Sequence, residues 1–100
     1  MEESDDAEMR DFEFDAFNTR HLAAHGVTEA VVWDVWLDEP VLVPDRPEHS
    51  GTHLMIGMDS GGALWTIAMI CVDDELGLWR PIRGFPTERE DERDAWYGEN

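Results

Sequence analysis

The sequence has no lysine, a single cysteine, a single tyrosine and no long run of apolar residues. Its seven arginines stand against 24 aspartates and glutamates, which gives a net charge of −17 with the histidines neutral. Because phosphate binding draws on lysine and arginine, this balance opposes nucleic-acid binding and favours a basic protein as partner. The same acidity is also typical of proteins adapted to a salt-rich cytoplasm, and in that case it implies no partner.

Two absences bear on compartment and chemistry. With Cys71 as the only cysteine, the chain can form neither an internal disulfide nor a cysteine-based zinc site. Cys71 lies in an apolar stretch, so we expect a buried structural thiol. The chain lacks 18 consecutive apolar residues, and its start, MEESDDAEMR, lacks the features of a signal peptide. We therefore expect a cytoplasmic protein that does not associate with membranes.

Apolar residues make up 42% of the 100 residues, and five tryptophans with four phenylalanines supply large side chains for a core. That length suits one domain. Residues 1–11 are acidic with little apolar content, and we expect them to form a disordered leader. Residues 12–100 are expected to form the single folded domain.

The first half of the domain predicts a short strand and two helices. Phe12 and Phe14 alternate with acidic residues, as in a short edge strand. A helix is expected from Asp15 or Ala16 to His25, with Asp15 as N-cap and Gly26 after its end. Thr28 is expected to cap a second helix that ends before Pro40. Trp33 and Trp36 on that helix are interpreted as core residues.

The second half predicts an antiparallel sheet and a last helix. A short strand is expected at residues 41–43, and the DSGG sequence between residues 53–58 and 63–72 predicts a hairpin. The second hairpin strand is apolar on both faces, so it should be central and covered on two sides, by this chain or by a second copy in a homodimer. LWRPIRG, residues 78–84, predicts an edge strand, because Pro81 lacks an amide N–H. Thr87 as N-cap and Glu90 predict a final helix to Tyr97. The order indicates an α+β fold with three or four antiparallel strands.

Several phrases of the chain occur in an order that resembles the BrnT family, the toxin half of a bacterial toxin–antitoxin pair related to RelE-like ribonucleases. The phrases are FEFD at residues 12–15, HGVT at 25–28, MIGMDSGGALWTI at 55–67 and WRPI at 79–82, followed by a glutamate-rich helix that ends at Tyr97. The resemblance implies a metal-independent ribonuclease without a cofactor. It also implies a cognate antitoxin of the ribbon-helix-helix type as partner. The chain departs from the family at Ala24, Ala63 and Phe85, where the family has or often has a basic residue.

Ribonuclease chemistry without a metal needs a group to activate the 2′-hydroxyl, a cation to stabilise the phosphate and an acid for the leaving oxygen. The resemblance identifies Arg80 as the first candidate for the phosphate, with His53 or His25 as acid or base and Tyr97 as a helper. Arg83 is a further candidate. It lies three positions after Arg80, so the two should point to opposite faces of a strand unless Pro81 introduces a bulge.

Other arrangements of the same residues were weighed. His21 with His25, and His49 with His53, have a spacing that a metal site can use, but no third ligand is evident and we expect no metal. Arg83, Arg89 and Arg93 are interpreted first as surface counter-ions, whereas Arg80 is equally interpretable as a counter-ion or as a phosphate contact. The sequence thus leaves two hypotheses: a toxin-like ribonuclease that acts on RNA, or a catalytically inactive acidic module that binds a basic protein as an inhibitor or nucleic-acid mimic.

Overall fold

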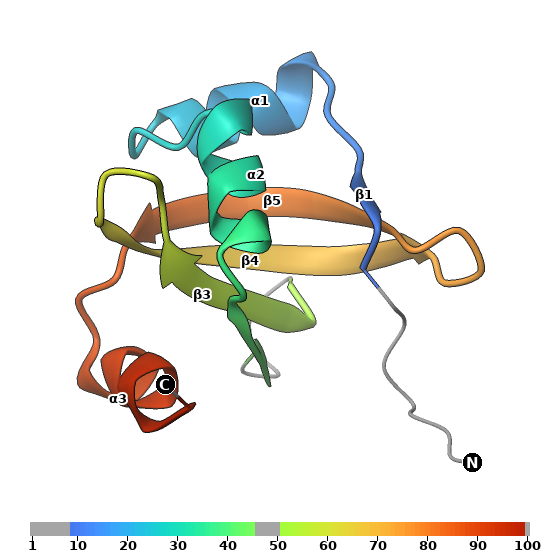
Figure 1. Cartoon of the computed structure of the whole chain (residues 1–100). Helices are drawn as coiled ribbons and strands as arrows, with labels where there is room; N and C mark the ends of the chain where they lie inside the picture. The colour runs from blue at the N-terminus through green and yellow to red at the C-terminus, as the bar shows by residue number, and fades with distance from the viewer. Residues whose placement is uncertain (1–8, 46–50, 100) are drawn as a thin grey trace, which may run out of the picture.

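The computed structural model describes residues 9–45 and 51–99, which form a five-stranded sheet with three helices (Figure 1). The elements in chain order are β1 (Asp11–Phe12), α1 (Ala16–Ala23), α2 (Glu29–Leu37), β2 (Val41–Pro44), β3 (His53–Met58), β4 (Leu64–Asp73), β5 (Leu78–Pro86) and α3 (Glu90–Glu99). The strand order is β1-β5-β4-β3-β2. β1 is parallel to β5, and all other neighbouring strands are antiparallel. The predicted α+β fold is confirmed.

β4 is the central strand, as predicted, and helices of the same chain cover both of its faces. α1 and α2 lie over one face of the sheet and α3 lies against the other (Figure 1). Ile67 of β4 belongs to the core on the first face, and Ala68 to the core on the second. The first core contains Met9, Phe12, Leu22, Val27, Val32, Val35, Met55, Ile67, Met69 and Trp79. The second contains Val41, Leu54, Ile56, Ala68 and Trp96.

The first two helices begin at the predicted caps. The Asp15 carboxylate accepts hydrogen bonds from the backbone N–H groups of Phe17 and Asn18, and the Asn18 side chain accepts one from the Asp15 N–H. Thr28 caps α2 by accepting from the Val31 N–H. Gly26 has a φ of +86°, a conformation that glycine adopts without steric cost, and it turns the chain from α1 towards α2.

α1 is fixed to β5 by one polar side chain and one close approach. Asn18 is buried, and its Nδ2 donates to the carbonyl oxygens of Glu13 and Pro81, at 2.9 and 2.8 Å. A Cβ added at Gly84 of β5 would lie 2.9 Å from Cγ2 of Val27. Glycine at this position therefore lets the α1–α2 turn pack directly on the sheet.

α3 is attached to the sheet by a buried polar group, and its predicted start is wrong. The helix begins at Glu90 and not directly after Thr87. The Thr87 side chain instead lies 2.7 Å from the hydroxyl of Thr66 in β4, which also donates to Glu92. Because the Thr87 hydroxyl bonds to the Thr66 side chain, the segment between β5 and α3 stays against the sheet, and the helix starts only after this segment. The helix also runs past Tyr97, to Glu99.

Two other boundaries differ from expectation. β5 is not an edge strand at its start, because β1 pairs with Leu78 and Trp79. Residues 1–8 of the predicted leader lie outside the described residues, but ordered structure begins before residue 12. Met9 is buried in the first core, and the Arg10 N–H donates to the Gly77 carbonyl oxygen. The apolar Met9 side chain thus brings the end of the leader into the domain.

No helix in residues 9–45 or 51–99 combines the length and the apolar character needed to cross a membrane.

Candidate functional site

Arg80, the leading candidate for a phosphate contact, is held by two carboxylates. Its Nη1 lies 3.0 Å from Oε1 of Glu13, and its Nη2 lies 3.0 Å from Oδ1 of Asp15. The hydrogen bond from Arg80, supported by the Asn18 N–H, lowers the pKa of Asp15 from 3.8 to about 2. The hydrogen bonds to Asp15 and Glu13 raise the pKa of Arg80. The guanidinium thus joins β5 to the segment that leads into α1, and its charge is compensated within the chain.

The strand around Arg83 contains the irregularity that would bring the two arginines to one face. The register of the β4–β5 pair changes between Ala68 and Met69. As a result, Arg83 pairs with Ala68, and Arg80 pairs with Ile70. Ala68 and Ile70 have the same parity on β4, so both arginines start from the same face of the sheet. Their head groups nevertheless have separate partners, because Nη2 of Arg83 lies 3.6 Å from the buried Oδ2 of Asp45.

The segments that carry His25 and Tyr97 lie on opposite sides of the sheet (Figure 1). His25 lies in the exposed turn after α1, and the neighbouring Gly26 lies near the Trp65 ring. Trp65 is five residues from Ile70, the partner of Arg80, which corresponds to about 16 Å along a strand. Tyr97 lies on α3, on the other side of the sheet from α1, and is exposed with its ring 5.9 Å from Cζ of Arg93.

His53 has a structural environment. Its ring is half-buried and packs edge-on against Trp79, with ring centroids 5.1 Å apart, and its Nδ1 lies 3.0 Å from Oγ1 of Thr52. His21 packs on Phe17, and its Nδ1 lies 3.1 Å from the Phe17 carbonyl oxygen. His49 lies outside the described residues. In the described part of the chain, no three metal-binding side chains come together.

The expectation of a buried Cys71 is wrong. The thiol is exposed, because Cys71 lies near the end of β4, next to a register shift between Cys71 and Asp73. Desolvation and the nearby Asp74 carboxylate raise the pKa of the thiol. A raised pKa keeps the sulfur protonated at neutral pH, so Cys71 is a poor nucleophile despite its exposure.

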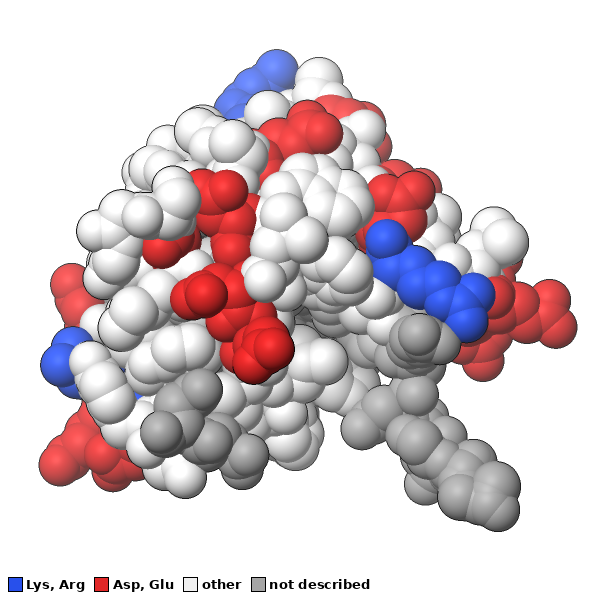
Figure 2. All heavy atoms as spheres, in the orientation of Figure 1, with Lys and Arg blue, Asp and Glu red and all other residues white. Residues whose placement is uncertain are grey.

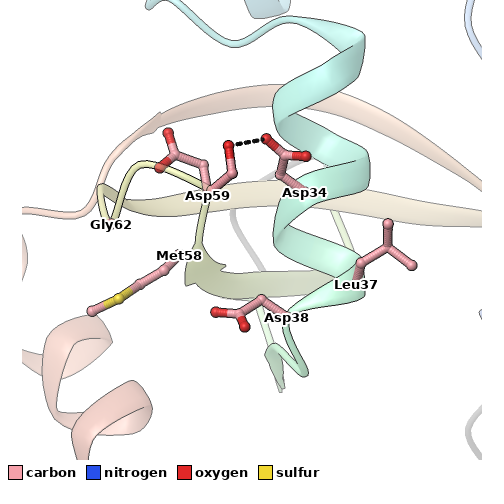
Figure 3. Close-up of a pocket in the computed structure, with 7 residues that line it drawn as sticks. Asp34, Leu37, Asp38, Met58, Asp59 and Gly62 are labelled. Atoms are coloured by element: carbon pink, nitrogen blue, oxygen red, sulfur yellow. Dashed lines mark hydrogen bonds between the residues drawn. The ribbon is translucent and has the colours of Figure 1, made fainter.

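A groove lies between the last turns of α2 and the turn that joins β3 to β4. This acidic groove has a volume of about 440 Å³ and is lined by Asp34, Leu37, Asp38, Met58, Asp59, Ser60 and Gly62. Asp34 and Asp38 project from the same side of α2, and Met58 extends from β3 in the direction of α3 (Figure 3). The volume falls in the range of small-ligand pockets. The lining combines carboxylates with two apolar side chains.

The turn side of the acidic groove is held by side-chain hydrogen bonds. Oδ1 of Asp59 accepts from the N–H groups of Gly61 and Ala63, and its Oδ2 accepts from the Trp65 indole at 2.9 Å. These bonds, led by that from Trp65, lower the pKa of Asp59 and keep it ionised. Ser60 then donates to Oδ2 of Asp34 at 3.1 Å and links the turn to α2 (Figure 3).

The acidic groove lies on a negatively charged face of the molecule. Figure 2 shows carboxylates in the middle of the face that α2 and the β3–β4 turn occupy in Figure 1, whereas the arginines of this view lie at its margins. The sequence analysis did not single out this site. Its only sequence signals were the Asp59–Gly62 turn and two aspartates four residues apart on a helix, Asp34 and Asp38.

No protein-family model matches the chain, and no curated protein matches it significantly.

Proposed function

We propose that this chain is an acidic binding module whose partner is a basic protein segment. The observation that carries the proposal is the contrast between its two kinds of charge. Arg80 and Arg83 are engaged by carboxylates of the same chain. Asp34 and Asp38, in contrast, line an open groove. With a net charge of −17, the long-range field attracts polycations and repels polyanions.

The binding test uses two labelled probes of similar length and opposite charge. One is a fluorescent peptide of alternating arginine and leucine, and the other is a single-stranded RNA. Fluorescence anisotropy with the full chain should show saturable binding of the peptide, with an affinity that falls as salt is added. RNA should neither bind nor be cleaved. Binding of RNA in preference to the peptide would contradict the proposal.

A second candidate function is the metal-independent ribonuclease that the resemblance to the BrnT family implies, with a ribbon-helix-helix antitoxin as its basic partner. One observation favours it: the register shift at Ala68 lets Arg80 and Arg83 start from the same face of the sheet. Phosphate contact through Arg80 would then require release of its guanidinium from Glu13 and Asp15.

Expression of the chain alone, with growth and bulk RNA integrity followed, tests this second candidate. Growth arrest with RNA cleavage that Arg83→Ala abolishes would support it, and normal growth would count against it. Each arginine variant also changes contacts within the chain, because Arg80→Ala removes two ion pairs and Arg83→Ala removes the ion pair with the buried Asp45. The folds of both variants must therefore be checked by circular dichroism, and Arg93→Ala on α3 serves as the control for loss of one positive charge.

A further inference from the structure

The end of α2 has the wrong charge for its position. The backbone dipoles of a helix create partial negative charge at its C-terminus, where cationic side chains are stabilising. α2 has Asp38 as its C-cap residue and no basic residue in its last turn. The first turn of α2 carries Glu29, an acidic residue that is favourable at a helix N-terminus. The C-terminal end of α2 is therefore electrostatically unfavourable in the free chain.

Nothing in the described part of the chain compensates this end of α2. The Asp38 carboxylate makes no hydrogen bond or ion pair with the described residues. Asp34, one turn earlier, receives a neutral hydrogen bond from Ser60 through one oxygen. Leu37 lies between them in sequence and is 69% exposed, the largest exposed fraction among the exposed apolar side chains of the described residues.

From these features we infer that the acidic groove receives one arginine or lysine side chain of a basic partner segment. The cationic head lies between Asp34 and Asp38, next to the last carbonyl groups of α2, and supplies the positive charge that the helix end lacks. The aliphatic part of the same side chain packs on Met58, and a neighbouring apolar residue of the partner covers Leu37. This inference rests on the proposed function and adds where, and through which groups, the basic segment binds.

The inference predicts opposite effects of one substitution on folding and on binding. Asp38→Asn removes the unfavourable charge and keeps the shape of the side chain, so it should raise the Tm of the free chain by about 2 to 6 °C. The same change removes one exposed ion pair with the partner and should weaken peptide binding about three- to fivefold.

Glu29→Gln is the matched control, because it removes one exposed carboxylate from the other end of the same helix. It should lower the Tm slightly and leave the affinity for the peptide unchanged within about a factor of 1.5. A second variant, Leu37→Ser, changes a side chain that is mostly exposed. It should reduce affinity for the arginine-leucine peptide and leave affinity for an arginine-glycine peptide of equal charge unchanged.

The experiment measures the affinities by anisotropy and maps the bound peptide by ¹H–¹⁵N NMR of the full chain. Shifts confined to the C-terminal end of α2 and to the β3–β4 turn, with Asp38→Asn weaker and Glu29→Gln unchanged, are the expected result. Shifts spread evenly over the acidic surface, with both variants equally weakened, would overturn the groove and leave the proposed function intact. Absence of any binding to either peptide would overturn the proposed function itself.

Discussion

At the scale of single residues, Arg80, Arg83 and Arg89 form ion pairs with acids of the same chain. Arg80 was the strongest functional candidate in the sequence, yet its guanidinium contacts Glu13 and Asp15. These two acids belong to the same FEFD phrase that gave the resemblance its first motif. The phrases FEFD and WRPI can therefore reflect a contact that holds the fold together, without any catalytic role.

The pKa of Asp15 gives this contact a signature in acid. Since the pKa is lowered from 3.8 to about 2 in the folded chain, the contact contributes stability that is complete above about pH 4 and is lost as the pH falls towards 2. Asp15→Asn keeps an N-cap residue and removes the charge. We expect it to destabilise the chain near pH 6 and to have little effect near pH 2. Urea unfolding across this range checks the difference between the two chains, and a difference independent of pH would contradict the assignment.

Asn18 is the other residue on which the position of α1 depends. Its side chain makes three hydrogen bonds in a buried site, to the Asp15 N–H and to the carbonyl oxygens of Glu13 and Pro81. Asn18→Ala should lower the free energy of unfolding by about 2 to 4 kcal/mol, because it leaves buried backbone groups without partners. Chemical denaturation provides the measurement. A loss below about 0.5 kcal/mol would mean that water or a backbone shift replaces these bonds.

At the scale of elements, the turn between α1 and α2 is in direct contact with β5 at Gly84. A methyl group there would lie 2.9 Å from the Val27 side chain, so Gly84→Ala should destabilise the chain by about 1 to 3 kcal/mol. Combination with Val27→Ala should recover part of the loss.

Gly98 is the control, since a Cβ there meets nothing within 4 Å. In a helix, Gly98→Ala should stabilise by up to about 1 kcal/mol, as thermal unfolding will measure.

The elements that local signals define were predictable from the sequence. Asp15 and Thr28 cap helices as expected, and the Asp59–Gly62 turn forms the predicted hairpin. The failures involve contacts between distant residues. Thr87 has the side chain of an N-cap, but its hydroxyl reaches Thr66, 21 residues away. The exposure of Cys71 depends on where a register shift falls in β4, which no local pattern reports.

The acidic groove could not be predicted for the same reason. Asp34 and Asp38 share a helix face, but their proximity to Met58 follows from the packing of α2 over β3. The separation of His25, Tyr97 and Arg80 is likewise a property of the fold. The spacing of these residues along the chain gives no indication that they lie on different faces and ends of the sheet.

At the scale of the whole molecule, the net charge of −17 should make stability depend on salt. Like charges repel in the compact state, and raising NaCl from about 0.1 to about 1 M shortens the screening length from about 10 to about 3 Å. We expect the Tm to rise over this range. Sorbitol at matched osmolality is the uncharged control. A Tm that stays constant or falls with NaCl would show that self-repulsion is unimportant.

From the arrangement of the helices we expect a monomer. α1 and α2 cover one face of the central strand and α3 packs on the other, so a second copy is not needed to bury β4 (Figure 1). Pro40 and Pro44, at and beside the ends of β2, lack the amide N–H groups that an added strand would use. Light scattering after gel filtration should give the mass of one chain. A dimer that persists in about 0.5 M salt would contradict this account.

The most direct test of the central claim is a titration of the full chain into the labelled arginine-leucine peptide at several salt concentrations, with the RNA probe alongside. The account predicts one-to-one binding of the peptide that weakens steadily with salt, and no binding or cleavage of RNA. Turnover of RNA by the purified chain, or absence of peptide binding even at low salt, would contradict it.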